Sequence, residues 1–359
     1  MRQFPLFATL AGTMVLAALT ACTSTTSLGA KGTTILGPGV INDPTNRSLR
    51  FDILKFGLER FCSEMTDRGI ALKLSDEHPV LGRFFADSCQ SEVVDEETRK
   101  SLLLHFTGRG YAWTNLTGRL GFRVVALVEY SPDFQMAKDR SLYVYFRPRN
   151  IQATSYQTTL VESQLAKGAM ALSGVDPDQL GRRIFDAELN RGFSVIRSDE
   201  RGEMTYALGF VPVGVRPFVP FQIVSQKVTL ANDRTEVHNN EQDIVGGFQV
   251  TSGGQALTIT ALVDGAPNVD LALISDRSGK QLLDWLVTRP GASPLSEPAM
   301  LEDTISYGQI WQRTVPVAPG TYYLLFDQST AVGRSAPPAA AGDDRAARID
   351  YAVQLGDAP

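Results

Sequence analysis

The chain has 359 residues, of which 34 are Lys or Arg and 39 are Asp or Glu, for a formal net charge of −5 at pH 7. Such a mildly acidic chain lacks the basic footprint that nucleic acid requires, so we exclude a nucleic-acid partner. Hydrophobic residues make up 43% of the chain, which is enough to pack the cores of two domains of ordinary size.

Residues 1–21 have the three parts of a secretory signal peptide. A basic start at Arg2 precedes an apolar stretch that ends at Leu19, and small residues follow at Thr20 and Ala21. The stretch is shorter than the roughly 20 apolar residues that a membrane-spanning helix needs. We therefore expect export of the chain and removal of this segment.

The sequence Leu-Thr-Ala-Cys at residues 19–22 resembles a bacterial lipobox with Cys22 at the modified position. The resemblance implies that Cys22 receives a diacylglyceryl thioether, that cleavage falls before it, and that its new amino group is acylated. Two or three acyl chains would anchor the protein stably in a membrane, because each buried CH₂ contributes about 0.8 kcal/mol to the free energy of membrane binding. Thr23 is not the aspartate that retains such lipoproteins at the inner membrane, so the resemblance implies the outer membrane, facing the periplasm. The alternative is an ordinary secretory signal that a cysteine happens to follow.

Residues 22–45 are rich in Thr, Ser, Gly and Pro and show little apolar periodicity. This composition predicts a flexible tether between the lipid and the folded part of the chain. The membrane is then one partner of the protein, through the lipid on Cys22.

Two cysteines remain after lipidation, Cys62 and Cys89. An even pair in an oxidising compartment predicts a disulfide bond. Two buried free thiols are the competing interpretation, and a catalytic cysteine is less favoured than either.

Residues 46–225 are expected to form an α+β domain, with helices packed on an antiparallel sheet. Apolar residues at helical spacing predict a first helix within 49–65, and Pro79 near the start of 78–89 favours a second, shorter one. Asp176 as N-cap, Pro177 in the first turn and Gly192 at the end predict a further helix over 176–192. Short runs rich in β-branched and aromatic residues predict strands at 101–107, 122–130, 141–148, 155–162, 193–197, 203–211 and 218–224.

Residues 226–359 are expected to form an all-β sandwich of jelly-roll type, because no helix signal of any length is found there. Residues 276–279 have the composition of a hairpin turn. About eight strands are predicted, at 226–230, 245–250, 256–263, 269–275, 282–287, 309–317, 321–327 and 348–355.

Within this part, "NVDLALISDRSGKQLLDW" and the later "WQRTVPVAPGTYYLLFDQS" resemble the small jelly-roll modules of the pre-peptidase C-terminal and GOLD-like type. The likeness covers roughly residues 228–356. It implies an accessory binding or targeting domain that has no catalytic role.

Catalytic and metal-binding motifs are absent from the sequence. There is no HExxH, no G-x-S-x-G, no phosphate-binding loop and no cluster of cysteines, and the chain has only 3 histidines. We therefore predict a protein that is not an enzyme, with no cofactor and no metal site.

The strand at 141–148 carries apolar residues on both faces, so both faces must be covered. A helix on one face and a loop or neighbouring domain on the other would suffice. The alternative is an apolar groove that holds lipid, with Arg147 and Arg149 near its mouth, because guanidinium groups suit phosphate. Both arginines are candidate ligand-binding residues on this second interpretation.

Three functions follow from these observations. The first is a non-enzymatic binding or scaffolding role at the outer membrane, with a protein partner in the cell envelope. The second is the binding or carriage of lipid, and the third is an enzyme of unrecognised type.

The lipid anchor is directly testable. We expect mass analysis of the protein produced in a bacterium to find residues 1–21 removed and fatty acyl chains on Cys22. A product without acyl chains, or with the leader still attached, would contradict the predicted location.

Overall fold

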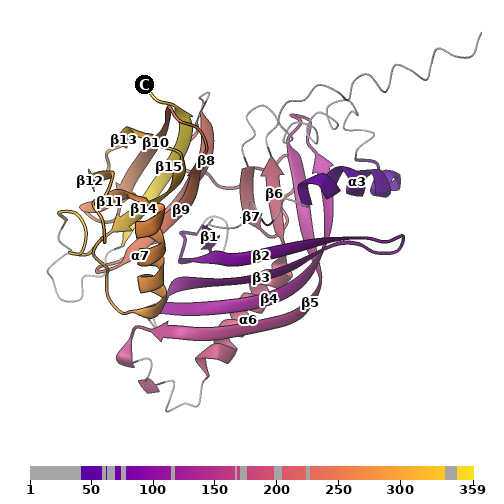
Figure 1. Ribbon diagram of the computed structural model, residues 1–359, viewed down its shortest axis with the longest axis horizontal. Helices are drawn as coiled ribbons and strands as arrows, with labels where there is room; N and C mark the ends of the chain where they lie inside the picture. The colour runs from indigo at the N-terminus through magenta and orange to yellow at the C-terminus, as the bar shows by residue number, and fades with distance from the viewer. Residues whose placement is uncertain are drawn as a thin grey trace, which may run out of the picture.

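The computed structural model describes residues 42–58, 62, 69–73, 78–114, 118–165, 168–169, 176–197, 204–223, 227–335 and 346–359. These residues are predominantly β, and neighbouring strands within each sheet are antiparallel. A curled sheet lies on one side of the molecule and a β-sandwich on the other (Figure 1). Cys22 and residues 22–41 of the expected tether lie outside the described residues.

The curled sheet is seven-stranded, and its strands follow one another in sequence order. In the middle of β4, alternate residues from Phe122 to Tyr130 are buried, which is the period of a strand with one face on a core. The strands are β1 (Gly69–Leu72), β2 (Gly82–Asp95), β3 (Lys100–Thr114), β4 (Gly118–Met136), β5 (Leu142–Val161), β6 (Phe193–Arg197) and β7 (Met204–Leu208).

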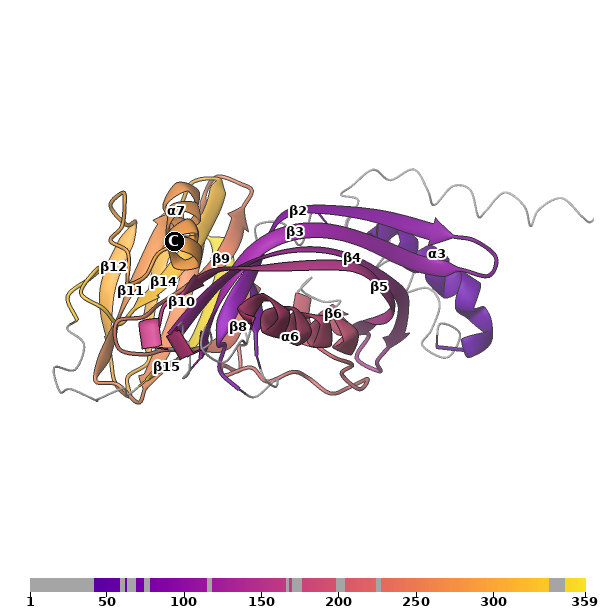
Figure 2. The same ribbon diagram turned by 90° about the horizontal axis from the view of Figure 1, so that it is seen from below.

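Helix α6 (Pro177–Arg191) forms as the sequence predicts. The Asp176 carboxylate accepts a hydrogen bond from the backbone N–H of Asp178, and the helix ends at Gly192, whose φ is 65°. Only glycine adopts such a conformation readily. The long strands arch over α6 (Figure 2), and its side chains Phe185 and Leu189 pack into the core beneath them.

Helix α3 (Arg47–Leu58), which follows the short η1 (Pro44–Asn46), occupies part of the first predicted helix. It buries Phe51, Leu54 and Leu58 in the core that α6 also covers. Spacings of three and four residues place these side chains on one face.

The predicted second helix is wrong, because residues 82–89 belong to β2. Phe84 packs into the core beneath α6, whereas Phe85, on the opposite face, packs toward the sandwich. A strand that is buried on both faces reads as a continuous apolar run, which periodicity cannot distinguish from a short helix. The extra strand makes this part of the chain predominantly β, with α3 and α6 packed against the sheet. The antiparallel sheet of the prediction is present, and the α+β class is not observed.

The predicted disulfide is present: Cys62 and Cys89 are joined, with their Cα atoms 5.2 Å apart. It connects the segment after α3 to strand β2, and no helical hairpin is involved, because Cys89 lies in the sheet.

The β-sandwich consists of two four-stranded antiparallel sheets, with strand orders β13-β10-β15-β8 and β12-β11-β14-β9. Its core lies between them and includes Leu257, Ile259, Leu271, Leu324 and Val353. The strands are β8 (Val228–Val237), β9 (Gln242–Val250), β10 (Gln255–Asp264), β11 (Asn268–Ser275), β12 (Leu301–Ser306), β13 (Trp311–Val317), β14 (Gly320–Asp327) and β15 (Ala347–Asp357).

One helix of the sandwich contradicts the prediction. Residues 276–279, expected to form a turn, begin α7 (Asp276–Thr288), which also contains the expected strand at 282–287. Ser275 caps the helix by accepting a hydrogen bond from the Ser278 N–H. The spacing of Leu282, Leu286 and their neighbours places one apolar face against the sheet, and β12 supplies the eighth strand in place of the one predicted at 282–287.

The strand predicted at 218–224 is not observed, because its described residues, 218–223, form no strand. None of the described helices combines the length and the apolarity that crossing a bilayer requires.

We expect the Cys62–Cys89 bond to stabilise the protein by about 3.5 kcal/mol, because it closes a loop with a sequence separation of 27. Denaturant unfolding with and without a reducing agent measures this difference. A double variant with both cysteines changed to serine is the matched control, since a reductant should leave its stability unchanged. Equal stability of the oxidised and reduced wild-type protein would contradict the prediction.

Candidate functional site

The curled sheet and the sandwich are joined by a buried ion pair between Arg83 on β2 and Asp243 on β9. The Arg83 Nε and Nη2 atoms donate to the Asp243 carboxylate at 3.0 and 2.7 Å. The same carboxylate accepts from the Tyr111 hydroxyl at 2.6 Å and from the Thr235 hydroxyl at 2.7 Å. Tyr111 also accepts from the backbone N–H of Ile244 at 3.0 Å, so the network spans both units.

The ionised state of this network follows from its geometry. Burial raises the pKa of Asp243, but the charge of Arg83 and the hydrogen bonds from Arg83, Tyr111 and Thr235 outweigh it and hold the pKa below its ordinary value. Burial, together with the nearby Asp243 charge, raises the pKa of Tyr111 well above its ordinary value. The pair is therefore charged at neutral pH, and Tyr111 is a hydrogen-bond donor.

A second joint connects β4 and β5 with the end of α7. A Cβ on Gly121 would lie 2.0 Å from the backbone oxygen of Val287, so only glycine permits this approach. That oxygen accepts from the Thr159 hydroxyl at 2.7 Å. The buried Arg119 donates to the backbone oxygens of Arg289 and Gly291 at 2.5 and 3.0 Å, and so fastens the chain beyond α7.

Between these units lies a cavity of about 560 Å³ with a mostly apolar lining. One wall is the concave side of the curled sheet and α6, and the other belongs to the sandwich and the segment before β8. Apolar residues of the first wall are Ile70, Leu72, Phe84, Ala86, Leu104, Phe106, Phe185, Leu189 and Phe193, and those of the second are Val219, Phe221, Leu230, Ala231, Val245 and Phe248.

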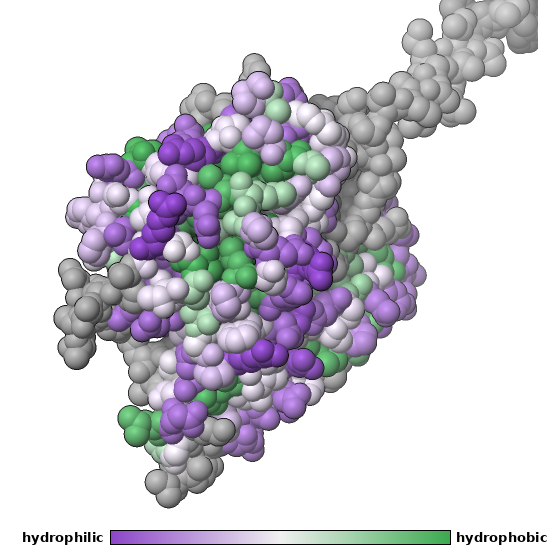
Figure 3. Space-filling view, turned by 60° about the vertical axis from the view of Figure 1, so that its left-hand side comes forward, coloured by the Kyte–Doolittle hydropathy of each residue, from purple (hydrophilic) through white to green (hydrophobic). Residues whose placement is uncertain are grey.

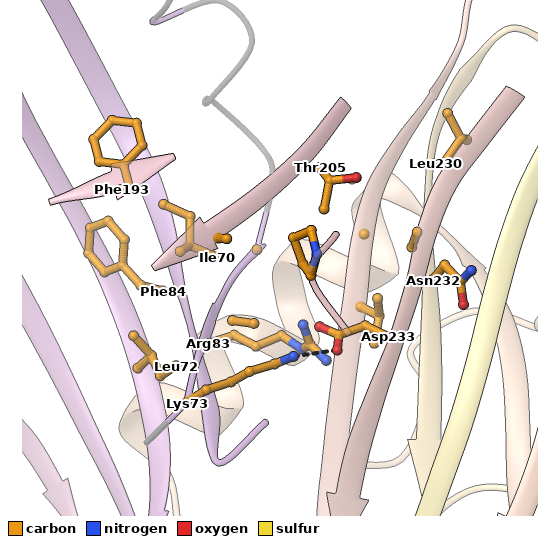
Figure 4. Close-up of a pocket in the computed structure, with 18 of the residues that line it drawn as sticks. Ile70, Leu72, Lys73, Arg83, Phe84, Phe193, Thr205, Leu230, Asn232 and Asp233 are labelled. Atoms are coloured by element: carbon orange, nitrogen blue, oxygen red, sulfur yellow. Dashed lines mark hydrogen bonds and ion pairs between the residues drawn. The ribbon is translucent and has the colours of Figure 1, made fainter. Parts of the chain in front are cut away.

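Charged side chains around the cavity have partners of opposite sign. Lys73, beside β1, makes an ion pair with Asp233 on β8, and Figure 4 shows its side chain reaching across from one wall to the other. Arg83 also lines the cavity, so the junction network forms part of its wall. Paired charges and apolar walls suit a guest whose buried part is apolar, because an isolated charge buried there would need a partner of its own.

The two faces of the first half of β5 are both covered. Val144 and Phe146 pack into the core beneath α6, and Tyr143 and Tyr145 point the other way. The Tyr143 and Tyr145 hydroxyls donate to backbone oxygens of the loop after β7, at 3.1 and 2.8 Å. A helix on one face and a loop on the other therefore cover both faces of this part of β5.

Neither Arg147 nor Arg149 is among the residues that line the cavity. The guanidinium of Arg147 lies over the Phe210 ring, 4.4 Å from its centroid. Arg149 is half-exposed and lies 4.0 Å from the Glu129 carboxylate. Arg147 thus lies against the loop after β7 and Arg149 beside β4, and neither belongs to the apolar walls.

The residues that join the two walls of the cavity were not identified from the sequence. Arg83 and Asp243 are 160 positions apart, as are Lys73 and Asp233. No local motif connects positions so distant, and only the pairing of the two units brings them together. In the described ranges, no group of three His, Cys, Asp or Glu side chains is arranged to hold a metal ion.

No family model matches the chain, and no curated protein matches it. Among solved structures, the Bombyx mori GH32 beta-fructofuranosidase BmSUC1 is 10% identical, over 82% of this chain and 79% of that chain, with a TM-score of 0.09. So low a TM-score carries no argument about fold or activity. The function must be inferred from the cavity and its surroundings.

We expect Arg83→Met to lower the free energy of unfolding by about 3–5 kcal/mol, because it leaves the Asp243 charge buried without a partner. The contribution of Asp243 is present at neutral pH and is lost as the pH falls below about 4, since its folded-state pKa is depressed. Urea unfolding at several pH values measures both effects.

Lys73→Met is the matched control for this variant, because its partner Asp233 is partly exposed and the expected loss is about 1 kcal/mol or less. The double variant Arg83→Met, Asp243→Leu removes both charges and should be more stable than Arg83→Met alone. Equal losses for Arg83→Met and Lys73→Met would contradict the importance of the buried pair.

Proposed function

We propose that this is a non-enzymatic, lipid-anchored envelope protein that binds an acyl chain in the cavity between its curled sheet and its sandwich. The observation that carries the proposal is a cavity of about 560 Å³ with apolar walls and paired charges. Small-molecule sites typically have volumes of roughly 300–1,000 Å³ and lie preferentially between domains.

The chemistry of the walls supports an aliphatic guest. Leu, Ile, Val and Phe side chains from seven helices and strands, and from the segment before β8, line the space. Burial of apolar surface yields about 25 cal/mol per Å². The Lys73–Asp233 pair offers polar groups at one place in the lining, where the head of an amphiphile can be hydrogen-bonded.

The location of the protein is part of the proposal. The lipobox-like segment ending at Cys22 supports an anchor in the outer membrane that faces the periplasm. The resemblance of residues 228–356 to jelly-roll accessory modules supports a binding or targeting role for the sandwich. Lipid binding beside a membrane is consistent with both.

A second candidate, a scaffolding role with a protein partner, is favoured by the surface of the sandwich. Met300, Tyr307 and Ile310 are exposed there, Ile310 to 70%. Figure 3, in which the sandwich side of the molecule comes forward, shows hydrophobic residues gathered on this face among hydrophilic ones. Exposed apolar side chains that gather on a surface mark interaction sites in many soluble proteins.

The acyl-chain proposal predicts that the purified protein binds a fluorescent polyene fatty acid, and that Leu72→Asp weakens this binding at least about tenfold. A tenfold change corresponds to about 1.4 kcal/mol, less than the cost of placing a charge against an apolar guest. Titration followed by fluorescence measures the affinity, and native mass spectrometry detects lipid that co-purifies.

Leu165→Asp is the matched control, because Leu165 is 89% exposed and does not line the cavity. Leu72→Trp, which fills space and adds no charge, should weaken binding as well, and it guards against misfolding of the Asp variant. Absence of fatty-acid binding by the wild-type protein, or an equal loss in Leu165→Asp, would refute the proposal.

A further inference from the structure

The loop between β7 and β8 exposes apolar side chains at the surface. Phe210, Val213 and Val215 are 41%, 37% and 49% exposed. Large apolar side chains so close together are rare on a surface that contacts only water, and they indicate an interaction site.

The loop is held in place, so the exposure of these side chains is built into the fold. The Val215 N–H donates to the Pro212 oxygen at 3.0 Å and closes a turn at the tip. The backbone oxygens of Val211 and Val215 accept from the buried Tyr145 and Tyr143. Val211 packs inward between these contacts, which leaves its neighbours on the outside.

Arginines surround this apolar tip. Arg147 lies over the Phe210 ring, and Arg149 follows two residues further along β5, at a register shift, 4.0 Å from the Glu129 carboxylate. Arg216 follows the tip directly and is more than half exposed, and Arg140 is exposed on the turn between β4 and β5.

The carboxylates near these arginines neutralise them only in part. Glu129, the neighbour of Arg149, accepts two hydrogen bonds at 2.9 Å from Arg99. Asp139 pairs with Arg216 at 3.0 Å, but both groups are largely exposed, and such pairs contribute little. The loop is therefore a local cationic site on a chain whose net charge is −5.

The start of the described chain lies beside the same site. The side-chain amide of Asn42 exchanges two hydrogen bonds with the backbone of Met136, at 2.9 and 2.8 Å. Met136 ends β4, directly before the turn that carries Arg140. Cys22 precedes Asn42 by 20 residues, so a lipid on Cys22 would tether this corner of the fold to a bilayer.

We propose that the loop of residues 210–216 docks on the surface of a bilayer that contains anionic phospholipid. Phe210, Val213 and Val215 enter the boundary between headgroups and acyl chains, and Arg147, Arg149 and Arg216 bind lipid phosphates. Basic residues close to an anionic membrane surface are attracted to it electrostatically. Arg216 also borders the cavity, so docking brings the cavity to the membrane. This inference goes beyond the proposed acyl-chain binding and does not depend on it.

The test places an environment-sensitive fluorophore on the full-length protein at Val213→Cys, since Cys62 and Cys89 are already joined. The labelled protein is reconstituted in vesicles of phosphatidylcholine, with or without phosphatidylglycerol, that contain spin-labelled lipid. We expect a blue shift and quenching at position 213 in the anionic vesicles only. The fluorophore at Ile310→Cys, on the exposed sandwich surface, is the matched control and should show neither.

Replacing Arg147, Arg149 and Arg216 together with Gln should abolish at least about half of the quenching at position 213. Equal signals at positions 213 and 310, equal signals in neutral and anionic vesicles, or unchanged quenching in the triple variant would each overturn the inference. Fatty-acid titration of the double variant Arg147→Gln, Arg149→Gln separates the two proposals, because neither of these residues lines the cavity. Normal fatty-acid affinity with lost quenching supports membrane docking, and absent fatty-acid binding with retained quenching refutes the acyl-chain proposal alone.

Discussion

The buried Arg83–Asp243 pair is the interaction on which the arrangement of the two units depends. It connects β2 with β9 inside a low-dielectric environment, where either charge alone would cost several kcal/mol. A domain of ordinary stability has only about 5–15 kcal/mol in total. The hydrogen bonds from Tyr111 and Thr235 occupy the remaining acceptor positions of the carboxylate, so that the network tolerates few alternative arrangements.

The cavity is a consequence of this joint. The curled sheet and the sandwich each have a packed core of their own, and a third cluster, which contains Phe85, Tyr111 and the apolar face of α7, lies between them. Contact is tight at that cluster and at Gly121, where the backbones meet. Elsewhere the curvature of the sheet keeps the walls apart, and the apolar space remains. Curvature together with a rigid joint therefore produces a preformed site, which lowers the entropic cost of binding a flexible guest.

The loop after β7 and the cavity lie next to each other in the chain. Residues 210–216 carry the exposed apolar tip, and the residues from Pro217 onward enter the cavity wall. A docked loop would therefore shorten the path of an acyl chain from a bilayer to the apolar walls. The two proposals share Arg216, which borders the cavity, and otherwise use different residues, so each has its own experiment.

Short sequence patterns correctly predicted the elements that are set by residues close together in the chain. Helix α6 has its cap at Asp176 and its end at Gly192, and most strands of the sandwich appear at the expected residues. Two predictions from apolar runs were wrong. Strand β2 was predicted as a helix, because its burial on both faces removes the alternation of a strand. Helix α7 was predicted as a turn and a strand, although Ser275 caps it and its apolar residues share one face. Pro79 was a helix signal in a segment that forms a strand, and residues 276–279 had the composition of a turn but begin a helix.

The sequence by itself determined the antiparallel sheets and the C-terminal sandwich, the helix with the Asp176 cap and the partnership of Cys62 and Cys89, because these depend on composition and short spacings. It also predicts the lipid on Cys22, which lies outside the described residues. Only the tertiary structure decided that Arg83 meets Asp243, that Lys73 meets Asp233, and that apolar walls enclose a space between them. Those pairs are 160 positions apart, and side chains so distant in sequence find each other only through the packing of whole sheets.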